Sequence, residues 1–438
     1  MKLRLTALAT VALVGALAMA DMTPVHTQVN VPGIDKPVVV VSGRIRGTVN
    51  WTNNYYWVLR GAVFVEQGAT LNIQAGTRIV GEAGSVGTLI VLQGGKLNAI
   101  GTREQPIVFT SDQAPGTRAR GDWGGLIING RAPLNVPGGI AEGEADTGFY
   151  GGNDPNDNSG SLRYVRLEFA GTEFSPDNEL NGIAFQGVGR GGSYEYLQVH
   201  MNKDDAFEWF GGTADIKYAV ASNTGDDSFD WTFGWQGRGQ FLAVHQRGDD
   251  ADAGIEADNN EFNNEFLPRS SPILYNLTLC GDPDRDEGPE STRGMILRRG
   301  TAGIIRNFIV MGFKTVGVDI NGSSSFREAQ QGNLQMSNGV IYLTGPTGTT
   351  YGTANTLSLI SSGIFRNIVL GQDPGIRDCF NHLQPDFRPR SVATLAGGQL
   401  APAIPPNDGF FEAVTFIGAV GPGEDDDWTA GWTAYPQQ

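Results

Sequence analysis

The segment YLQVHMNKDDAFEWFG at residues 196–211 is repeated 22 residues later as YAVASNTGDDSFDWTF at residues 218–233. Tyr196 falls on Tyr218 in this alignment, and the aspartate pairs and the two tryptophans also coincide. A looser third copy runs through residues 247–256. A unit this short cannot bury its own apolar side chains, so it becomes stable only when copies stack on one another. The sequence therefore predicts a solenoid.

Short strands separated by glycine corners indicate which solenoid this is. Residues 57–80 alternate apolar and polar positions between glycines, and 62 of the 438 residues are glycine. We predict an all-β fold, a right-handed single-stranded parallel β-helix with rungs of about 22 residues. The hand follows the general rule for parallel crossovers. Phe207 should stack on Phe229, and Trp209 on Trp231, inside the coil.

The N-terminus has the pattern of a cleaved signal peptide. Lys2 and Arg4 precede an apolar run, and Ala18-Met19-Ala20 is typical of a cleavage site. This predicts a periplasmic or extracellular protein without a transmembrane segment. The expected organisation is a signal peptide at 1–20, an N-terminal cap at 21–57, the β-helix at 58–420 and a C-terminal capping tail at 421–438.

Charge and cysteine content limit the partners and the compartment. The chain has 31 Lys and Arg against 47 Asp and Glu, a net charge of −16, so we exclude nucleic acid as a partner. The two cysteines, Cys280 and Cys379, are either disulfide-bonded in an oxidising compartment or two buried thiols. Spacing alone leaves both alternatives open.

Several motifs resemble one family. They are GKLNAIGT at 95–102, PIVFTS at 106–111, RGDWGGL at 120–126, FEWFGG at 207–212 and DWTAGWT at 427–433. In these motifs the chain resembles little-characterised secreted bacterial β-helix proteins of the pectin-lyase-like superfamily. The resemblance implies the parallel β-helix fold and implies no settled activity.

The repeat also predicts a column of carboxylates. Strand alternation sends Phe207 and Trp209 into the core and Glu208 outward. Asp230 should stack on Glu208, and Glu256 should continue the column. Beside this column, aspartate pairs recur at the turns, where like charges on adjacent rungs oppose folding unless a cation or proton intervenes. The pairs are Asp204 with Asp205, Asp226 with Asp227, and Asp249 with Asp250.

Three interpretations of these acids compete. Aspartates cap turns locally. Calcium prefers six to eight oxygen ligands and suits paired acids in an exported protein. Two carboxylates about 5 Å apart would also serve a retaining glycosidase. No cofactor is required by the sequence, and calcium is the one candidate. A second candidate calcium loop contains Asp282, Asp284 and Asp286, although its spacing is not that of an EF-hand.

Histidines align with the acids. The same offsets place His200, Ser222 and His245 in one column, about 10 Å from first to last. A base of this kind beside a groove would support sugar chemistry, whereas the alternative, which we favour, is that these histidines bond to turns or face solvent. The candidate catalytic set is His200, Glu208, Asp226, Asp230 and His245.

Two classes of function follow. The first is a binding module for a polysaccharide or a cell-surface protein along the flat sides of the coil. The second is a polysaccharide lyase or glycoside hydrolase that uses the acidic column and the histidines. We expect exposed aromatic and basic side chains to contact the ligand, and we leave self-association open. The ligand-binding candidates are Trp123, Tyr150, Lys203, Trp235, Arg238 and Arg247, with Phe149 beside them.

Overall fold

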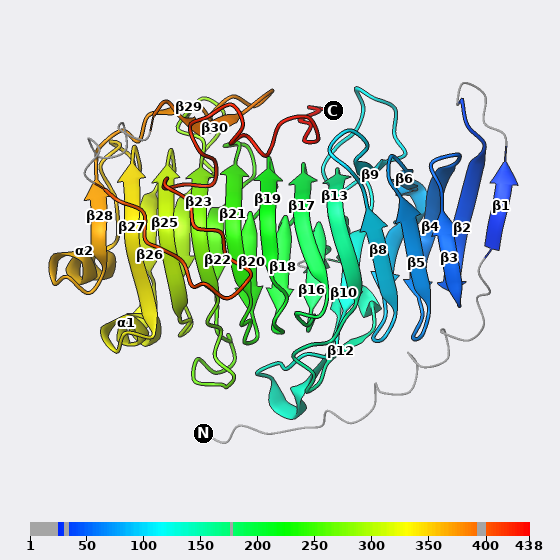
Figure 1. The fold of residues 1–438 in the computed structure, drawn as a ribbon, viewed down its shortest axis with the longest axis horizontal. Coiled ribbons are helices and arrows are strands. Elements are labelled where there is room, and N and C mark those ends of the chain that lie inside the picture. Colours follow the sequence, from blue (N-terminus) through cyan, green and yellow to red (C-terminus); the bar gives the residue numbers. More distant parts are fainter. Residues whose placement is uncertain (1–24, 30–34, 176–177, 392–399) are drawn as a thin grey trace, which may run out of the picture.

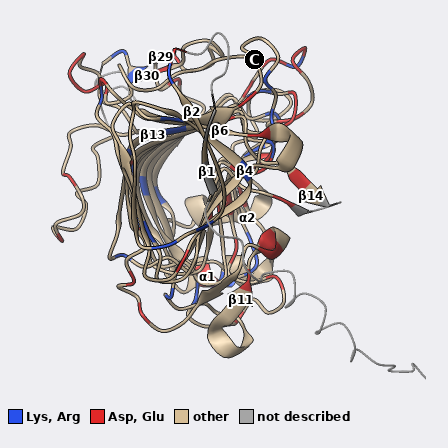
Figure 2. Cartoon of the chain, turned by 90° about the vertical axis from the view of Figure 1, so that its right-hand side faces the viewer, with Lys and Arg blue, Asp and Glu red and all other residues tan. Residues whose placement is uncertain are grey.

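A computed structural model describes residues 25–29, 35–175, 178–391 and 400–438. The proposed signal peptide at 1–20 and the first residues of the proposed cap lie outside the described residues. The described chain is a parallel β-helix (Figure 1). Viewed along the coil, three faces of stacked strands surround the interior (Figure 2). No helix among the described residues is long and apolar enough to cross a membrane.

Each coil contributes a strand to three parallel sheets in turn. The first sheet contains the short strands and the second halves of β2 and β4. Its short strands are β7 (Thr88–Val91), β10 (Gly125–Asn129), β16 (Ile183–Gln186), β18 (Phe207–Phe210), β20 (Phe229–Thr232), β22 (Ala253–Ala257), β24 (Arg293–Leu297) and β26 (Val316–Ile320).

Long strands bend and supply the second and third sheets with their first and second halves. These strands are β13 (Gly160–Glu168), β17 (Ser193–His200), β19 (Ile216–Ser222), β21 (Arg238–His245), β23 (Ile273–Cys280), β25 (Gly303–Met311), β27 (Leu334–Tyr342) and β28 (Arg366–Leu370). Near the N-terminus, β3 (Thr48–Trp51), β5 (Thr70–Gln74) and β8 (Lys96–Ile100) belong to the second sheet. The first halves of β2 (Val38–Ile45) and β4 (Tyr56–Val65), with β6 (Arg78–Gly81) and β9 (Ile107–Ser111), belong to the third.

The remaining elements are insertions and ends. They are β1 (Val25–Val29), η2 (Ala83–Ser85), η3 (Pro137–Gly139), β11 (Ile140–Glu142), η4 (Glu144–Asp146), β12 (Phe149–Gly151), β14 (Glu173–Ser175), β15 (Asn178–Glu179), α1 (Gly322–Gln330), α2 (Ala354–Ser361), β29 (Ile376–Asp378) and β30 (Asp386–Pro389).

Aromatic side chains fill the coil as the 22-residue repeat predicts. Phe207 and Phe229 are partners on adjacent rungs, with ring centroids 5.3 Å apart. Trp209 and Trp231 are also partners and buried, which confirms the predicted register. Trp235 packs between them, with its ring 4.4 Å from that of Trp209.

The bend between the second and third sheets is a column of residues with positive φ. Four aromatic residues start the column and four asparagines continue it, with φ between 49° and 60°. Asparagine tolerates this left-handed conformation, and the bulky residues there must be held by packing. In order, they are Tyr164, Tyr196, Tyr218, Phe241, Asn276, Asn307, Asn338 and Asn367.

The two ends differ from the predicted organisation. Coil strands already begin at Val38, inside the proposed cap, and only β1 pairs antiparallel at that end. The last coil strand ends at Leu370. Residues 400–438 do not close the last rung but return along the outside of the coil, where the chain turns from orange to red in Figure 1. Trp428 and Trp432 pack on Tyr218 and Tyr196, because that bend offers aromatic rings to cover.

Candidate functional site

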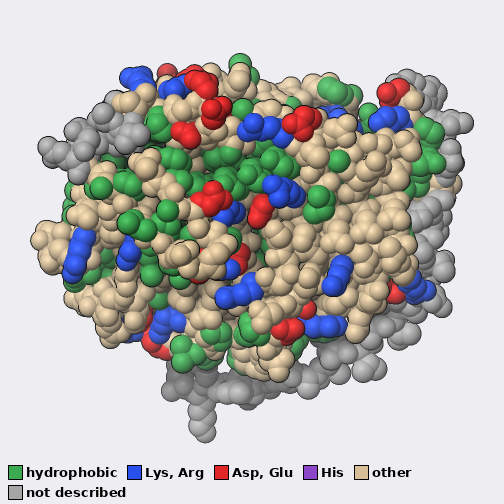
Figure 3. Space-filling model, viewed as in Figure 1, with side chains coloured by type: hydrophobic (Ala, Val, Ile, Leu, Met, Phe, Trp, Pro, Cys, Tyr) green, Lys and Arg blue, Asp and Glu red, His purple; other side chains and the backbone are tan. Residues whose placement is uncertain are grey.

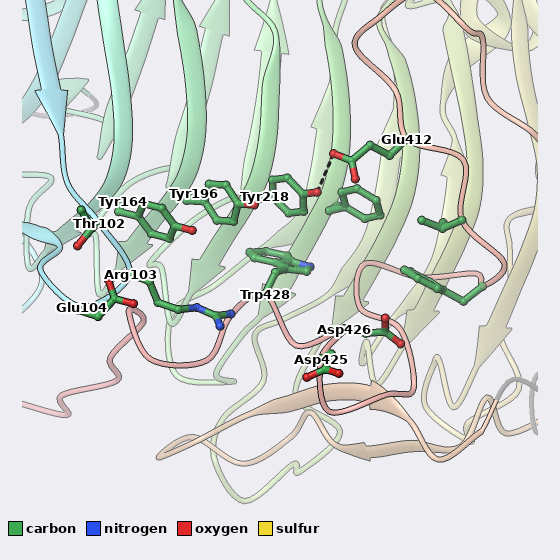
Figure 4. A pocket seen from close by; sticks show the side chains of 13 residues that line it. Thr102, Arg103, Glu104, Tyr164, Tyr196, Tyr218, Glu412, Asp425, Asp426 and Trp428 are labelled. Atoms are coloured by element: carbon green, nitrogen blue, oxygen red, sulfur yellow. Dashed lines mark hydrogen bonds between the residues drawn. The ribbon is translucent and has the colours of Figure 1, made fainter.

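A groove lies between the aromatic bend and the C-terminal segment. It has a volume of about 640 Å³. Tyr164, Tyr196 and Tyr218 form a partly exposed row along one side, with successive ring centroids 4.4 Å apart (Figure 4). Because the rings stack on one another, their edges and hydroxyl groups face the groove. The Tyr218 hydroxyl donates a hydrogen bond of 2.8 Å to Glu412.

The opposite side of the groove is mostly acidic. Arg103, Glu104, Asp425 and Asp426 line it, and Trp428 lies between these groups and the tyrosines (Figure 4). A guanidinium nitrogen of Arg103 donates to the carbonyl of residue 427 at 2.9 Å and so connects the N-terminal and C-terminal walls. Hydroxyl, carboxylate and guanidinium groups beside aromatic rings suit a polar ligand with apolar faces.

A second site is a cluster of carboxylates on the outer face of the first sheet. Asp205 accepts a hydrogen bond from the backbone N–H of Asp227 at 2.9 Å, and Asp227 accepts one from Ala253 at 2.6 Å. These hydrogen bonds align Asp205, Asp227 and Ala253 on adjacent rungs. The residues one position earlier are therefore also equivalent to one another, and they are Asp204, Asp226 and Asp252. Glu208, Asp230 and Glu256 are consecutive register partners in the same sheet. This confirms the order predicted for the column.

Inserted segments cover the inner part of the cluster, whereas Asp226 is exposed and Asp204 and Asp252 are half-buried. Asn181 donates from its amide to the carboxylates of both Glu208 and Glu144, which lies in η4. Arg298 contributes a positive charge by bonding to Glu256 and Asp258. Glu208 faces outward from the coil as expected, but these segments leave it only 7% exposed.

Burial keeps these acids from ionising at their usual pH. Burial, and then the charge of Asp204, raises the pKa of Glu144 to about 8. Burial and neighbouring acids raise the pKa of Asp204 to about 7 and that of Asp226 to about 6. Burial is also the main cause that raises the pKa of Glu256 to about 7. The same causes raise the pKa well above its ordinary value for Asp205, Glu208, Asp227 and Asp230.

Three groups within this cluster have oxygen atoms close enough to share one cation. In each group, one oxygen per residue lies within 4.8 Å of the others. Oδ1 of the fully buried Asn181 and Oδ1 of Asp230 have no hydrogen-bond partner among the residues that the structure describes. Hard oxygen donors in this number fit calcium. The groups are Asp204, Asp205 and Asp226; Asp205, Glu208 and Asp230; and Asp226, Asp227 and Asp252.

Comparison with known proteins supports the assignment of the coil. A family model described as the pectate-lyase like beta helix domain matches residues 43–362, nearly three quarters of the chain. The chain belongs to this family. Searches of curated proteins and of solved structures gave no match. The pectate-lyase-like match confirms the resemblance stated from the motifs. It ends before residues 400–438, so three carboxylates of the groove, those of Glu412, Asp425 and Asp426, lie outside it.

The third aspartate pair of this β-helix was assigned incorrectly from the sequence. Asp249 and Asp250 do not join the carboxylate cluster but form ion pairs with Arg120, at 3.1 and 3.8 Å. Asp252 takes the third position, because the chain lengthens before β22 and the backbone hydrogen bond to Ala253 sets the register. Local similarity could not reveal this shift.

Hydrogen bonds account for the separate loop at 282–288. Asp282 is buried and accepts from the backbone N–H groups of Gly248 and Asp284. Asp284 accepts from that of Asp286. Asp282, Glu287 and His382 also have ligand atoms within 4.8 Å of one another, so Asp284 and Asp286 lie outside that group.

Both candidate catalytic histidines are buried beneath the C-terminal half of the chain. His200 contacts the carbonyl of Pro436 at 2.8 Å, and His245 contacts the carbonyl of Cys379 at 2.8 Å and His382 at 3.0 Å. Burial lowers the pKa of His200 to about 4 and that of His245 to about 3. No histidine side chain is visible on the coloured surface in Figure 3. His200 and His245 lie on the third sheet and not beside the carboxylates of the first sheet. Their burial and their position contradict the predicted role as accessible bases.

Three aromatic ligand-binding candidates are buried, which corrects the expectation that they are exposed. Trp123 donates to the carbonyl of Glu168 inside the coil, and Trp235 donates to that of Ala214. Tyr150 is covered by the packing of inserted strands against the first sheet. Glycines allow this close packing, because a side chain at Gly81 or Gly237 would collide with Trp123 or Trp235. Phe149 is exposed, at 60% of its surface, and lies outside the groove.

The basic candidates are ion-paired. Lys203 bonds to Asp250 at 2.7 Å, and Arg247 lies within 4 Å of Asp249 and Glu287. Arg238 bonds to Asp215 and Asp408, and these hydrogen bonds raise its pKa. These ion pairs account for all three basic side chains without a ligand.

Cys280 and Cys379 form a disulfide in the structure, with Cα atoms 6.2 Å apart. The bond joins β23 to the segment after β29, where the chain starts to cover the third sheet.

The sequence analysis did not identify the tyrosine row of the groove as a site, although the 22-residue repeat already aligned Tyr196 with Tyr218. Its acidic wall had no sequence signal, because it belongs to a non-repeating segment.

Proposed function

We propose that the chain is an exported β-helix module that binds a polysaccharide in the groove beside Tyr164, Tyr196 and Tyr218. The single observation that supports this most is the row of tyrosine edges facing a wall of carboxylates and a guanidinium group. Sugar hydroxyls can hydrogen-bond to these charged groups, and sugar C–H faces can pack on the rings. The repeat of the coil extends the row over adjacent rungs.

Charge narrows the class of polysaccharide. Four carboxylates and one guanidinium line the groove, so an anionic uronate chain would be repelled. A neutral or amino-sugar polysaccharide fits better. The lyase or hydrolase alternative has less support, because His200 and His245 are buried and so is Glu208 of the carboxylate cluster.

Titration calorimetry with a neutral β-glucan, chitosan and polygalacturonate tests the groove. We expect the glucan or chitosan to bind without being cleaved, and polygalacturonate not to bind. The double variant Glu412→Gln and Asp425→Asn should weaken binding about tenfold, or about 1.4 kcal/mol. Asp35→Asn, an exposed carboxylate outside the groove, is the matched control. Equal affinity in both variants, or cleavage of polygalacturonate, would overturn the proposal.

We also infer that calcium stabilises the carboxylate cluster. The support comes from the unpartnered Oδ1 atoms of Asn181 and Asp230 together with the three groups of close carboxylates. A cation that binds only the folded state stabilises it by about 2.7 kcal/mol at a hundredfold excess over its dissociation constant. Calorimetry in chelator and in millimolar calcium should give different melting temperatures. Identical transitions would leave turn capping as the explanation of these acids.

Export belongs to the same proposal. It rests on Lys2, Arg4 and the cleavage pattern that ends at Ala20, together with the disulfide, a bond typical of oxidising compartments. We expect N-terminal sequencing of the protein recovered outside the cytoplasm to begin at Asp21. A mature protein that still begins at Met1 would contradict export by this route.

A further inference from the structure

The outer face of the third sheet is covered along its later rungs by this chain itself. Outward residues there, including Val220, Ala243 and Ile309, pack against Ile417 and Val420. Residues 400–438 form neither helix nor strand, so the cover is an irregular extended segment. The backbone N–H of Ala419 donates to the Thr278 hydroxyl at 2.8 Å. This face therefore accommodates an extended polypeptide.

Over the first rungs, the same face is an open apolar groove. Two outward rows continue the rows of the covered part: Val38, Tyr56 and Arg78 form one, and Val40, Val58 and Val80 the other. Val40, Val58 and Val80 are all partly exposed. With the loop at 112–118 as a wall, these rows enclose about 730 Å³.

The charges in this groove are unevenly matched. Of its two carboxylates, Glu82 forms an ion pair with Arg60 at 2.7 Å, whereas Asp112 keeps its charge and accepts a hydrogen bond from the backbone N–H of Ala83 at 3.2 Å. Arg78 and Arg118 belong to no ion pair within the described residues. Burial, and then the neighbouring charge of Arg78, lowers the pKa of Arg118. In a chain of net charge −16, a groove lined by three arginines and two carboxylates is locally positive.

We propose that this groove binds an extended peptide segment of a partner protein that places a carboxylate on Arg78 and Arg118 and apolar side chains on Val40, Val58 and Val80. Charge complementarity and continuity with the covered part of the sheet support this occupant. Apolar contacts along the two rows supply affinity for the peptide. A carboxylate held between the two guanidinium groups fixes the direction in which the peptide runs along the groove. The proposal is independent of polysaccharide binding, which concerns a different groove.

The probe is a fluorescein-labelled, C-terminally amidated peptide with the sequence GFFEAVTFIGAV, which copies residues 409–420 and carries one side-chain carboxylate within an apolar run. Fluorescence anisotropy with the full chain measures its binding. We expect saturable binding that Arg78→Gln and Arg118→Gln each weaken at least tenfold, because each removes a charge-assisted partner of the carboxylate. Val58→Asp should weaken it similarly by placing a negative charge on the floor.

Controls separate this site from the other surfaces. Arg366→Gln, an exposed arginine on β28, should leave the affinity unchanged, and a peptide with lysine in place of its glutamate should bind at least tenfold more weakly. Circular dichroism checks that each variant is folded. The proposal is overturned if the peptide does not bind or binds Arg78→Gln as well as wild type. It is also overturned if sedimentation shows dimers that Arg78→Gln abolishes, because the occupant is then a second copy of this chain.

Discussion

Asp205 and Asp227 occupy equivalent positions on adjacent rungs, and Oδ1 of Asp205 accepts a hydrogen bond of 2.9 Å from the backbone N–H of Asp227. Asp227 repeats this contact with Ala253 at 2.6 Å. Each carboxyl group therefore orders the backbone of the next rung, while ionisation of Asp227 opposes ionisation of Asp205. The hydrogen bond stabilises the fold, and repulsion between ionised neighbours opposes it.

Substitution of Asp227 separates these two effects. Asp227→Ala removes the acceptor for the buried N–H of Ala253, so we expect the free energy of unfolding to fall by about 1–3 kcal/mol. Asp227→Asn keeps an acceptor oxygen and removes a charge, so in chelator it should be at least as stable as wild type. Urea denaturation measures both. An equal loss in the two variants would mean that the charge itself stabilises the fold.

Stability in chelator should fall as the pH rises from about 6 to about 8. The pKa values of Asp226, Asp204, Glu256 and Glu144 are raised to about 6, 7, 7 and 8. Because the folded state holds these protons more tightly than the unfolded chain, deprotonation in this window costs stability. Scanning calorimetry measures the melting temperature. Saturating calcium should flatten this dependence, and a melting temperature that rises with pH would contradict the prediction.

The buried histidines predict a second loss of stability on the acid side. His200 and His245 have pKa values lowered to about 4 and 3, so the unfolded chain binds their protons first. The stability that neutral imidazoles contribute is present above the ordinary pKa near 6.5 and is lost as the pH falls toward about 4. We expect residues 400–438 to become protease-sensitive in that range. Replacement of both histidines by glutamine should reduce this pH dependence.

The disulfide should contribute measurably to stability. Cys280 and Cys379 are 99 residues apart, and closing a loop of that length is worth about 4–5 kcal/mol in the chain-entropy model. The variant with alanine at both positions leaves no buried hydroxyl and should unfold at lower urea concentration. NMR titration should also find the pKa of His245 nearer 6.5, because the segment that covers it is less tightly held. Equal stability with and without the bond would show that packing alone holds this segment.

Trp235 tests the distinction between a core residue and a ligand platform. Its ring packs between Trp209 and Trp231, so Trp235→Ala should cost about 3–5 kcal/mol of unfolding free energy. Affinity for the polysaccharide should not change in the folded variant. A large loss of affinity with little loss of stability would restore Trp235 as a binding residue.

The sequence by itself determined the coil. The 22-residue repeat and the alternation within each strand place Phe207 and Trp209 inside and Glu208 outside, because these positions depend on local geometry and identical neighbours. It also predicted the column of Glu208, Asp230 and Glu256. The same reasoning failed at Asp249, where an added stretch of chain shifts the register and only the backbone hydrogen bonds of the next rung define the partner.

Only the tertiary structure decided which outer faces of the coil are covered by another part of the chain and which are not. Residues 400–438 do not repeat, and they cover side chains far away in the sequence, so no local pattern predicts that His200 contacts Pro436. The same segment supplies the acidic wall opposite Tyr196 and leaves the face around Val58 open. Burial within a strand is a local property of alternation, whereas burial of an outer face depends on a distant segment folding back over it. For this reason the sequence predicted the register of the repeated core strands correctly, whereas it placed Trp123 and Trp235 on the surface and did not reveal which outer faces are covered.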